Sequence, residues 1–452
     1  MSIFNQLFKK TSPQQGIVMY YLIAIVAAFL MLNLPYVHKP GVHVNPIDTL
    51  FVAVSGISVT GLTPISIVDT YSTFGQIIIL IILNIGGVGV MAMGTVLWLV
   101  LRKRIGLRER QLIMLDNNRN TMSGAVKLII EIVRAILLIE LVGALLLAFY
   151  FYRDSSDIQY ALMQGFFVAI SSTTNAGLDI TGNSLIPYAD DYFVQTIVMF
   201  LITLGSIGFP VLLEVKAYIK NRIPNFRFSL FAKITTITYF ALFAFGTIVI
   251  LLLEANHAFQ GASWHKALFY AMFQSTTTRS AGLETIDITH FSDATNILMG
   301  LLMFIGSSPS SVGGGIRTTT FAILILFIIN FRNDTNSTTI KVFNREIQPS
   351  DIQKTFTVFG VATILTSVAI ILTSAFEGTK LSFLQVFFEI MSAFGTCGLS
   401  LGASGDGNDF TKVILMLLMF IGRVGLISFI IMIGGRKDPV MYHYPKEKIQ
   451  IG

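Results

Sequence analysis

Four copies of one short polar segment, each set between apolar runs, constrain this chain more than any other feature. Each copy begins with an apolar run that is too short to span a bilayer. A hairpin rich in hydroxyl groups and glycine follows, ends in Gly-Leu, and leads into a longer apolar run. The hairpins occupy residues 58–62, 174–178, 279–283 and 395–399, at steps of 116, 105 and 116 residues. Such self-similarity predicts four copies of one supersecondary unit.

The composition indicates a polytopic membrane protein. The 452 residues are 53% hydrophobic and only 12% charged, which the surface of a water-soluble domain would not tolerate. The single cysteine, Cys397, excludes an intramolecular disulfide framework. The first apolar run is too long for the core of a signal peptide, so we expect it to be a retained span. Eight apolar stretches are of spanning length, at residues 17–34, 74–101, 126–152, 192–217, 234–253, 296–330, 356–375 and 412–433.

Between the two spans of each copy lies an apolar segment better suited to a re-entrant half-helix than to a span. These segments cover residues 46–55, 158–171, 263–274 and 381–392. Helix-start residues precede them: Asn45 with Pro46 at the first helical position, Asp157, Ser263 and Ser382. The predicted fold is therefore an all-α polytopic membrane protein with four outer-helix, pore-loop and inner-helix repeats around one central pore.

The expected repeats divide the chain into four consecutive parts. They are residues 1–119 with pore loop 46–62, 120–227 with pore loop 158–178, 228–345 with pore loop 263–283 and a broken inner helix at 306–318, and 346–452 with pore loop 381–399 and the C-terminal tail.

The basic residues predict the topology of these repeats. Twenty-two Lys and Arg residues fall in the segments expected inside, and six fall in those expected outside. This asymmetry predicts cytoplasmic termini and pore loops that enter from outside. Because the basic residues set the topology, the net charge of +6 does not indicate a nucleic-acid partner. The outside segments also carry carboxylates, among them Asp48, Asp179, Asp190 and Glu284. Together they would concentrate cations at the mouth of the pore. The alternative is that they are solvated loop residues without such a role.

The pore loops predict a cation pathway. Non-helical backbone at membrane depth is tolerated only where protein or a water-filled cavity surrounds it, so four such segments favour a common cavity. Each half-helix would end at the bilayer centre and direct the negative end of its dipole there. Glycine permits the positive φ that turns carbonyl groups toward an axis, where rings of oxygens can replace the hydration shell of a monovalent ion. Helix capping and turn chemistry without an ion is the alternative for any single hairpin.

Each inner helix has a glycine 24–28 residues after its hairpin glycine, at Gly86, Gly205, Gly306 and Gly422. In three copies we expect these glycines mainly to permit close packing. The third copy instead has Pro309 and three consecutive glycines, Gly313 to Gly315, which should break the helix. No Gly-Lys-Ser/Thr follows, which excludes a phosphate-binding loop.

Arg423 is a charged residue near the centre of the last inner helix. A charge at that depth is costly and is usually functional. The alternative, a helix-packing ion pair, would need a carboxylate beside it, and the fourth repeat offers none. Arg134 fits that alternative better, because Glu131 lies one turn away in its own helix.

From residue 17 to residue 433 the chain resembles the superfamily of bacterial Trk and Ktr potassium transporters and plant HKT transporters. Gly61, Gly177, Gly282 and Gly398 match the filter glycines of that superfamily. Because the chain is compact and has no additional N-terminal helix pair, it is most similar to the membrane subunit of Ktr systems, of the KtrB or KtrD type. In plant relatives a serine at the first glycine accompanies sodium transport, so Gly61 favours potassium.

The resemblance implies roles for particular residues. The ion-binding filter would comprise Val59, Thr60, Gly61, Asn175, Ala176, Gly177, Ser280, Ala281, Gly282, Thr396, Cys397 and Gly398, with potassium as the bound metal ion. The gate would be an intramembrane loop with Ser310, Ser311, Gly313, Gly314 and Gly315, contacted by Arg423 through carbonyls or through Ser310 and Ser311. A merely structural kink is the alternative for this loop.

The function implied is potassium uptake across the bacterial plasma membrane, with no covalent cofactor and with sodium as a candidate modulator. The implied partners are a second copy of the chain, the lipid bilayer and a cytosolic octameric ring of nucleotide-binding RCK-type subunits. This ring would dock on the basic segment 102–110 and on the tail segment 441–445.

Two other functional classes are weighed against uptake through a channel-like pore. A cation-coupled secondary symporter of a small solute also uses broken helices, but it predicts two inverted repeats. An intramembrane enzyme would need catalytic residues at membrane depth, and the six histidines all fall in loops or near helix ends. We therefore expect no enzymatic activity.

Overall fold

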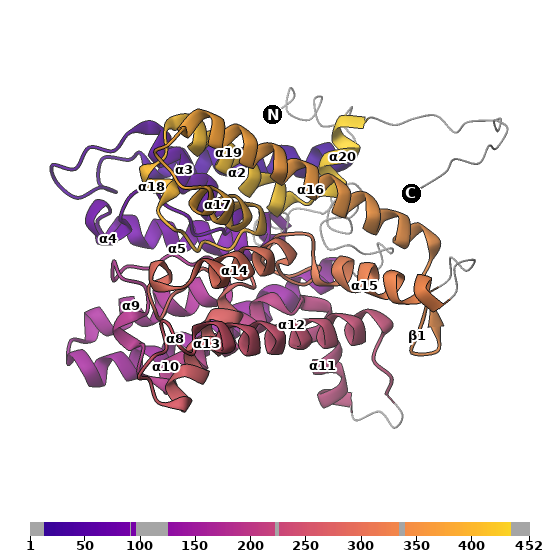
Figure 1. Ribbon diagram of the computed structural model, residues 1–452. Helices are drawn as coiled ribbons and strands as arrows, with labels where there is room; N and C mark the ends of the chain where they lie inside the picture. The colour runs from indigo at the N-terminus through magenta and orange to yellow at the C-terminus, as the bar shows by residue number, and fades with distance from the viewer. Residues whose placement is uncertain (1–12, 91, 96–124, 222–225, 334–339, 435–452) are drawn as a thin grey trace.

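A computed structural model describes residues 13–90, 92–95, 125–221, 226–333 and 340–434. Within these residues a long helix, a short helix, a loop and a broken helix follow one another four times (Figure 1). The first copy comprises α2 (Pro13–Leu32), α3 (Pro46–Ser58), α4 (Ile67–Thr70) and α5 (Thr73–Val88). The second comprises α8 (Ala125–Ser155), α9 (Ile158–Thr173), η1 (Ile186–Tyr188), α10 (Tyr192–Ser206) and α11 (Phe209–Asn221).

The third copy comprises α12 (Leu230–Glu254), α13 (Trp264–Thr277), η2 (Ile288–His290), α14 (Asp293–Ile305) and α15 (Thr318–Asn333). The fourth comprises α16 (Pro349–Glu377), α17 (Phe383–Gly395), α18 (Ala403–Asp406), α19 (Asp409–Val424) and α20 (Leu426–Gly434). A small antiparallel pair, β1 (Lys341–Val342) and β2 (Arg345–Glu346), joins the last two copies and was not expected in an all-helical chain.

The long helices are the outer spans that the apolar runs predict. Among the described residues, α2, α8, α12 and α16 are each apolar and long enough to cross a membrane by themselves. They expose large apolar side chains such as Leu22, Phe149 and Ile364. Lipid tails are as apolar as these side chains, so the exposure is suited to a bilayer.

The short helices are the predicted half-helices. Asp157 caps α9 by accepting from the backbone amides of Gln159 and Tyr160, and Ser382 forms a capping box with Gln385 at the start of α17. Asn45 and Ser263 occupy the cap positions of α3 and α13, but their side chains make no capping hydrogen bond. The start signals therefore place all four helices correctly, although only two act through the side chain.

The inner helices of the first, second and fourth copies differ from the continuous spans that were expected. Helices α10 and α11 meet at an angle of 103°. Each break outside the third copy falls on a glycine with positive φ, namely Gly89 (98°), Gly208 (99°) and Gly425 (91°). The packing role falls on the preceding glycines, since a methyl group at Gly86, Gly205 or Gly422 would lie within 3.0 Å of a carbonyl oxygen near the end of that copy's short helix. Packing and bending thus belong to different glycines of one motif.

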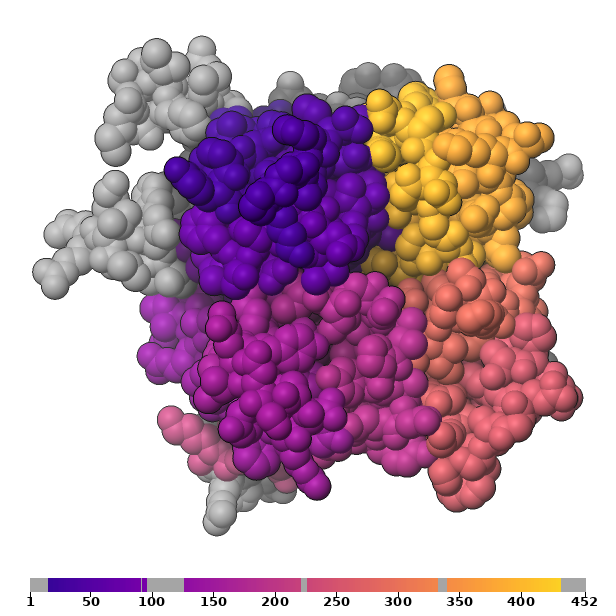
Figure 2. Space-filling model, turned by 90° about the vertical axis from the view of Figure 1, so that its left-hand side faces the viewer, coloured from indigo at the N-terminus to yellow at the C-terminus, as the bar shows by residue number. Residues whose placement is uncertain are grey.

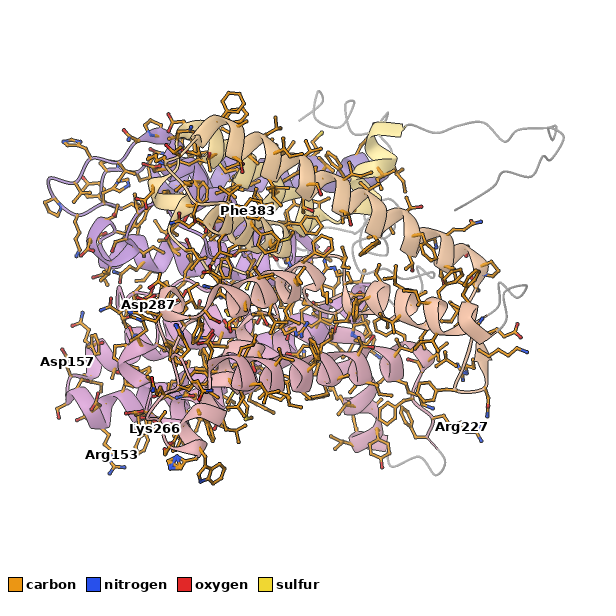
Figure 3. The ribbon with its side chains drawn as sticks, in the orientation of Figure 1. Arg153, Asp157, Arg227, Lys266, Asp287 and Phe383 are labelled. Carbon is orange, nitrogen blue, oxygen red and sulfur yellow. The ribbon has the colours of Figure 1, made fainter. Side chains whose placement is uncertain are left out.

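The four copies form a ring. Each inner helix packs on the short helix of the next copy, as α5 does on α9, α10 on α13, α14 on α17 and α19 on α3. Figure 2, which looks along the bundle, shows the copies as four quadrants with the first and last quarters of the chain side by side. In Figure 3 Arg153, Asp157, Lys266 and Asp287 lie toward one end of the bundle and Arg227 lies toward the other.

A buried ion pair joins the copies at the two ends of the chain. Lys412 of α19 places its Nζ 2.6 Å from Oδ1 of Asp48 in α3, and the two side chains are 11% and 10% exposed. Asp48 was counted among the carboxylates of the outside segments, but the packing of α19 on α3 buries it together with Lys412. The corresponding pair between the second and third copies, Lys266 with Asp190 at 2.8 Å, is 37% and 64% exposed.

We predict that Lys412→Met lowers the free energy of unfolding by about 3–5 kcal/mol, because it leaves the carboxylate of Asp48 buried without its partner. Lys266→Met is the matched control and should leave the unfolding midpoint almost unchanged, since its pair is solvated. Thermal unfolding in detergent measures both. Equal losses would show that burial of the Asp48 pair does not set its contribution.

Candidate ion pathway

The four hairpin glycines meet at the centre of the ring. A methyl group placed on any one of them would lie within 3.1 Å of Cα of the next hairpin glycine. The distances are 3.1 Å from Gly61 to Gly177, 2.8 Å from Gly177 to Gly282, 3.0 Å from Gly282 to Gly398 and 3.1 Å from Gly398 back to Gly61. The glycines thus follow one another around a closed circuit in chain order. We call Gly61, Gly177, Gly282 and Gly398 the ring glycines.

Carbonyl oxygens fill the space that a side chain would need at each ring glycine. At Gly61 the nearest atom is the carbonyl oxygen of Ala176, the residue before the next ring glycine. The same holds for Gly177 with Ala281, Gly282 with Cys397 and Gly398 with Thr60. Each of these approaches is closer than 3.0 Å, so a Cβ atom at a ring glycine would force the neighbouring backbone to shift.

The hairpin backbone alternates in handedness. The ring glycines have φ between 64° and 101°, and the residues two places before them, Val59, Asn175, Ser280 and Thr396, have φ between 47° and 71°. The residue between each pair does not have a positive φ. Alternation of this kind points successive backbone groups the same way instead of to opposite sides. The non-glycine residues at positive φ are strained, and the surrounding hydrogen bonds hold them there.

Hydroxyl groups of the short helices fix the hairpins. Ser55 Oγ accepts from the amide of Gly61 at 3.0 Å, and Ser392 Oγ accepts from the amide of Gly398 at 3.0 Å. Ser171 Oγ and Thr277 Oγ1 donate to the carbonyl oxygens of Leu178 (2.7 Å) and Leu283 (2.6 Å). The hydroxyl groups that hold the hairpins thus come from the last turns of the short helices.

Ser280 also links two hairpins, because its Oγ donates to the carbonyl of Gly395 at 2.8 Å.

The carbonyl groups of the expected filter residues are left free by this arrangement. Within the described part of the chain, none of the twelve expected filter residues accepts a hydrogen bond through its backbone oxygen. Buried carbonyl groups are normally paired, so a set of twelve without a protein partner is unusual. The C-terminal ends of α3, α9, α13 and α17 lead directly into these hairpins, and their dipoles add negative potential there.

The break in the third inner helix lies directly against the hairpins. A methyl group on Gly313 would lie 2.6 Å from Oγ of Ser280, and one on Gly314 would lie 2.6 Å from Oγ1 of Thr396. The structure thus brings the expected gate residues beside two expected filter residues. Ser311 bonds to Ser307 Oγ at 2.7 Å, and Gly315 has φ 82° and packs on the carbonyl of Phe304.

The second copy holds this loop from the side. The amide of Ser308 donates to the carbonyl of Ser206 at 3.0 Å, and the amide of Val312 donates to the carbonyl of Gly205 at 3.2 Å. In the opposite direction, the amide of Phe209 donates to the carbonyl of Ser310 at 2.9 Å, and Ser310 has φ 55°. The loop of the third copy is therefore bonded to the break between α10 and α11.

Arg423 binds a different segment from the one expected. Its guanidinium donates to the carbonyl groups of Gly86 and Gly87 in α5, and the side chain is only 8% exposed. The expected contact with Ser310 and Ser311 is thus not the one formed, because α5 ends at Gly89 and leaves carbonyl groups facing α19.

Arg317, for which the sequence predicted no role, contacts the gate loop as Arg423 was expected to do. It donates to Ser307 Oγ (3.3 Å) and to the carbonyl of Gly313. The sequence feature that could have indicated this role is its position: Arg317 lies just after three consecutive glycines within an apolar run.

Two further charged residues were missed at the hairpins. Arg279, the first residue of the third hairpin, is fully buried. Glu389, in the middle of α17, is 1% exposed and accepts hydrogen bonds from the segment after the fourth hairpin. A single carboxylate within a short apolar helix was the signal in that case.

Several carboxylates of the outside segments serve local structure. Asp191 caps α10, and Asp179 organises its own loop by accepting from Thr181, Gly182 and Ser184. Hydrogen bonds from Lys266 and Tyr270 lower the pKa of Asp190. Asp179 also lines an open cavity of about 290 Å³ above Gly61 and Gly177.

The comparisons with known proteins agree with this architecture. The family described as TrkH, cation transport protein, matches residues 6–434. The chain belongs to this family. It is 49% identical to the Ktr system potassium uptake protein D of Bacillus subtilis, over 99% of both chains. It is 31% identical to the potassium/sodium uptake protein NtpJ of Enterococcus hirae, over 98% of both chains.

A solved structure also matches. The potassium transporter TrkH of Vibrio parahaemolyticus superimposes with a TM-score of 0.73 at 19% identity, over 93% of this chain and 85% of that one. This likeness supports the fold of a helical membrane transporter, and the family is one of cation transporters rather than enzymes.

We predict that Gly177→Ala lowers cation flux in proteoliposomes at least about tenfold, because its methyl group would displace the neighbouring hairpin. Gly261→Ala is the control, since Gly261 also has positive φ (80°) but has no atom within 4 Å of the place that its methyl group would occupy. The control should transport normally and lose about 1–2 kcal/mol of stability. Normal flux in Gly177→Ala would contradict a tight ring.

Proposed function

We propose that this chain is the ion-conducting subunit of a potassium uptake system in the bacterial plasma membrane. The observation that carries the proposal is the closed circuit of ring glycines surrounded by carbonyl groups without a hydrogen-bond partner among the described residues. Rings of carbonyl oxygens can replace the hydration shell of a monovalent cation. The twelve expected filter residues, three from each hairpin, supply these oxygens and hold the transported potassium.

Potassium is the favoured ion for two reasons. The relatives from Bacillus subtilis carry the name potassium uptake protein, one at 49% and another, the Ktr system potassium uptake protein B, at 32% identity. Gly61 also retains the glycine that serine replaces in sodium-transporting plant relatives. Because the Enterococcus relative is named for both potassium and sodium, we include sodium as a modulator or a second ion.

The loop between α14 and α15 serves as the gate in this proposal. Gly313 and Gly314 lie against Ser280 and Thr396, where they obstruct passage from the filter toward the far end of the bundle. Opening requires the loop to leave this position. The bonds of the loop to Gly205, Ser206 and Phe209 make the break between α10 and α11 a natural lever, since movement there would pull on the loop.

The proposal includes the assembly and orientation that the family resemblance implies. The four parts 1–119, 120–227, 228–345 and 346–452 act as repeats, both termini face the cytoplasm, two copies form a homodimer, and a cytosolic ring of RCK-type subunits controls the gate. The expected docking segments, 102–110 and 441–445, lie outside the described residues.

A cation-coupled symporter of a small solute is the less favoured function. It requires two inverted halves, whereas the long and short helices here recur in the same order four times around one circuit.

We predict that the wild type, produced in cells that lack potassium uptake of their own, restores potassium uptake driven by the membrane potential, which supplies about 2.3 kcal/mol per charge per 100 mV. Gly61→Ser should weaken the preference for potassium over sodium, because its side chain must displace the carbonyl of Ala176. Uptake of rubidium and sodium tracers measures the preference. Equal transport of potassium and sodium by the wild type would refute the potassium assignment.

We further predict that deletion of residues 310–314 raises flux severalfold without changing that preference. The deletion removes Gly313 and Gly314 from beside the filter but leaves the hairpins in place. The same tracer assay tests it, and unchanged flux would contradict a gating role for the loop.

A further inference from the structure

Glu389 distinguishes the fourth short helix from the other three. It lies nine residues before its ring glycine, and the residues at that distance in the other copies are Val52, Val168 and Phe273. All four side chains are buried, with exposures of 0–2%. The fourth copy therefore places a carboxylate where the others place apolar packing. Such a burial is costly unless hydrogen bonds compensate for it.

The hydrogen bonds of Glu389 all come from the chain that follows the fourth hairpin. Its carboxylate accepts from Ser400 Oγ at 2.9 and 3.1 Å, from the amide of Leu401 at 3.3 Å and from the amide of Ser404 at 2.9 Å. Ser400 comes two residues after Gly398, and Ser404 lies in the first turn of α18. We call residues 399–404 the outer limb of the fourth hairpin.

In the second copy, the segment after the hairpin is held by a carboxylate in a different position. Its outer limb also wraps its amides around a carboxylate, that of Asp179, which accepts from the amides of Thr181, Gly182 and Ser184. Asp179 belongs to the limb itself, so these bonds shape the limb without attaching it to α9. Glu389 instead belongs to α17, and its bonds attach the limb to the short helix.

This attachment affects the filter because the limb continues directly from Cys397 and Gly398. A cage of carbonyl oxygens prefers potassium only if it resists contraction around a smaller cation, or if it keeps a fixed number of oxygens around the ion. Ser392 Oγ holds Gly398 from the inner side, at 3.0 Å from its amide. Glu389 holds the chain two residues further out. The fourth hairpin is thus fixed to α17 on both sides of the ring glycine.

We propose that Glu389 is a positioning residue for ion selection, and that its carboxylate keeps the carbonyl groups of Cys397 and Gly398 in place by fixing the outer limb to α17. The inference rests on the proposed function as a potassium pathway and adds a specificity-determining residue to it. Bonds between a carboxylate and several amides are charge-assisted and strong, which suits this task.

The test is the ratio of rubidium to sodium uptake in proteoliposomes that contain the full chain with Glu389→Gln. The amide keeps the size of the side chain but turns one acceptor into a donor that faces the amides and hydroxyl of the limb. We expect the ratio to fall about tenfold while rubidium flux remains measurable.

Glu377→Gln is the matched control. Glu377 is a buried carboxylate of the same copy that accepts from the amide of Asn408 and from Thr411 at the start of α19, away from the hairpin. It should lose thermal stability to a similar degree and keep the wild-type ratio. A fall of the same size in Glu377→Gln would overturn the proposal, because general loosening would then explain both.

The remaining outcomes separate this inference from the proposed function. A wild type without preference for rubidium would refute the proposed function itself. A selective wild type with an unchanged ratio in Glu389→Gln would refute only the role of Glu389. If Glu389→Gln does not fold, Ser400→Ala decides, since it removes one donor and leaves both amides on the carboxylate. We expect a fall of about threefold in that variant, and no fall would overturn the proposal.

Discussion

The pairing of main-chain polar groups within the bilayer is the constraint on which this structure depends. Four non-helical segments lie at the centre of the molecule, and lipid cannot satisfy their amide and carbonyl groups. The short helices meet the amides, through hydroxyl groups such as Ser55 and Ser392 and through their last carbonyl groups. The carbonyl groups of the twelve expected filter residues then accept no hydrogen bond within the described part of the chain. Oxygens that can face a cation are thus what remains unpaired once this membrane fold has satisfied its amides.

The sequence predicts those parts of the site that arise from local chemistry. Gly61 and its three counterparts could be found because the same order of apolar run, hydroxyl residues and glycine recurs every 105–116 residues. A helix end followed by left-handed backbone needs only neighbouring residues. The charged residues could not be placed in the same way. Lys412 and Asp48 are 364 residues apart in the chain, and nothing local shows that α19 meets α3. The partner predicted for Arg423 was wrong for the same reason. The carbonyl groups of α5 that it binds become available only because the helix breaks at Gly89, and the sequence did not predict that break.

The inner helices show why packing and bending were hard to separate from sequence. Gly205 and Gly208 lie three residues apart, yet Gly205 admits the end of α9 and Gly208 turns the chain through positive φ. A helix broken at this level presents carbonyl and amide groups that the neighbouring copy can use. The third copy does so, because its loop bonds to Gly205, Ser206 and Phe209. The break is therefore both a consequence of close packing at the centre and the attachment point for the loop beneath the filter.

A ring made from one polypeptide can treat each quarter differently. In an assembly of four identical subunits, a carboxylate behind one hairpin would appear behind all four, and the desolvation cost and mutual repulsion of the buried charges would increase together. Here Glu389, Arg423 and the loop at 306–317 each occur once, so a buried charge or a broken helix is tolerated in one quarter while apolar packing stabilises the others. Val52, Val168 and Phe273 show that packing alone suffices for the remaining short helices. The broken loop of the third copy and the buried carboxylate of the fourth thus lie in neighbouring copies, which contact each other through α14 and α17.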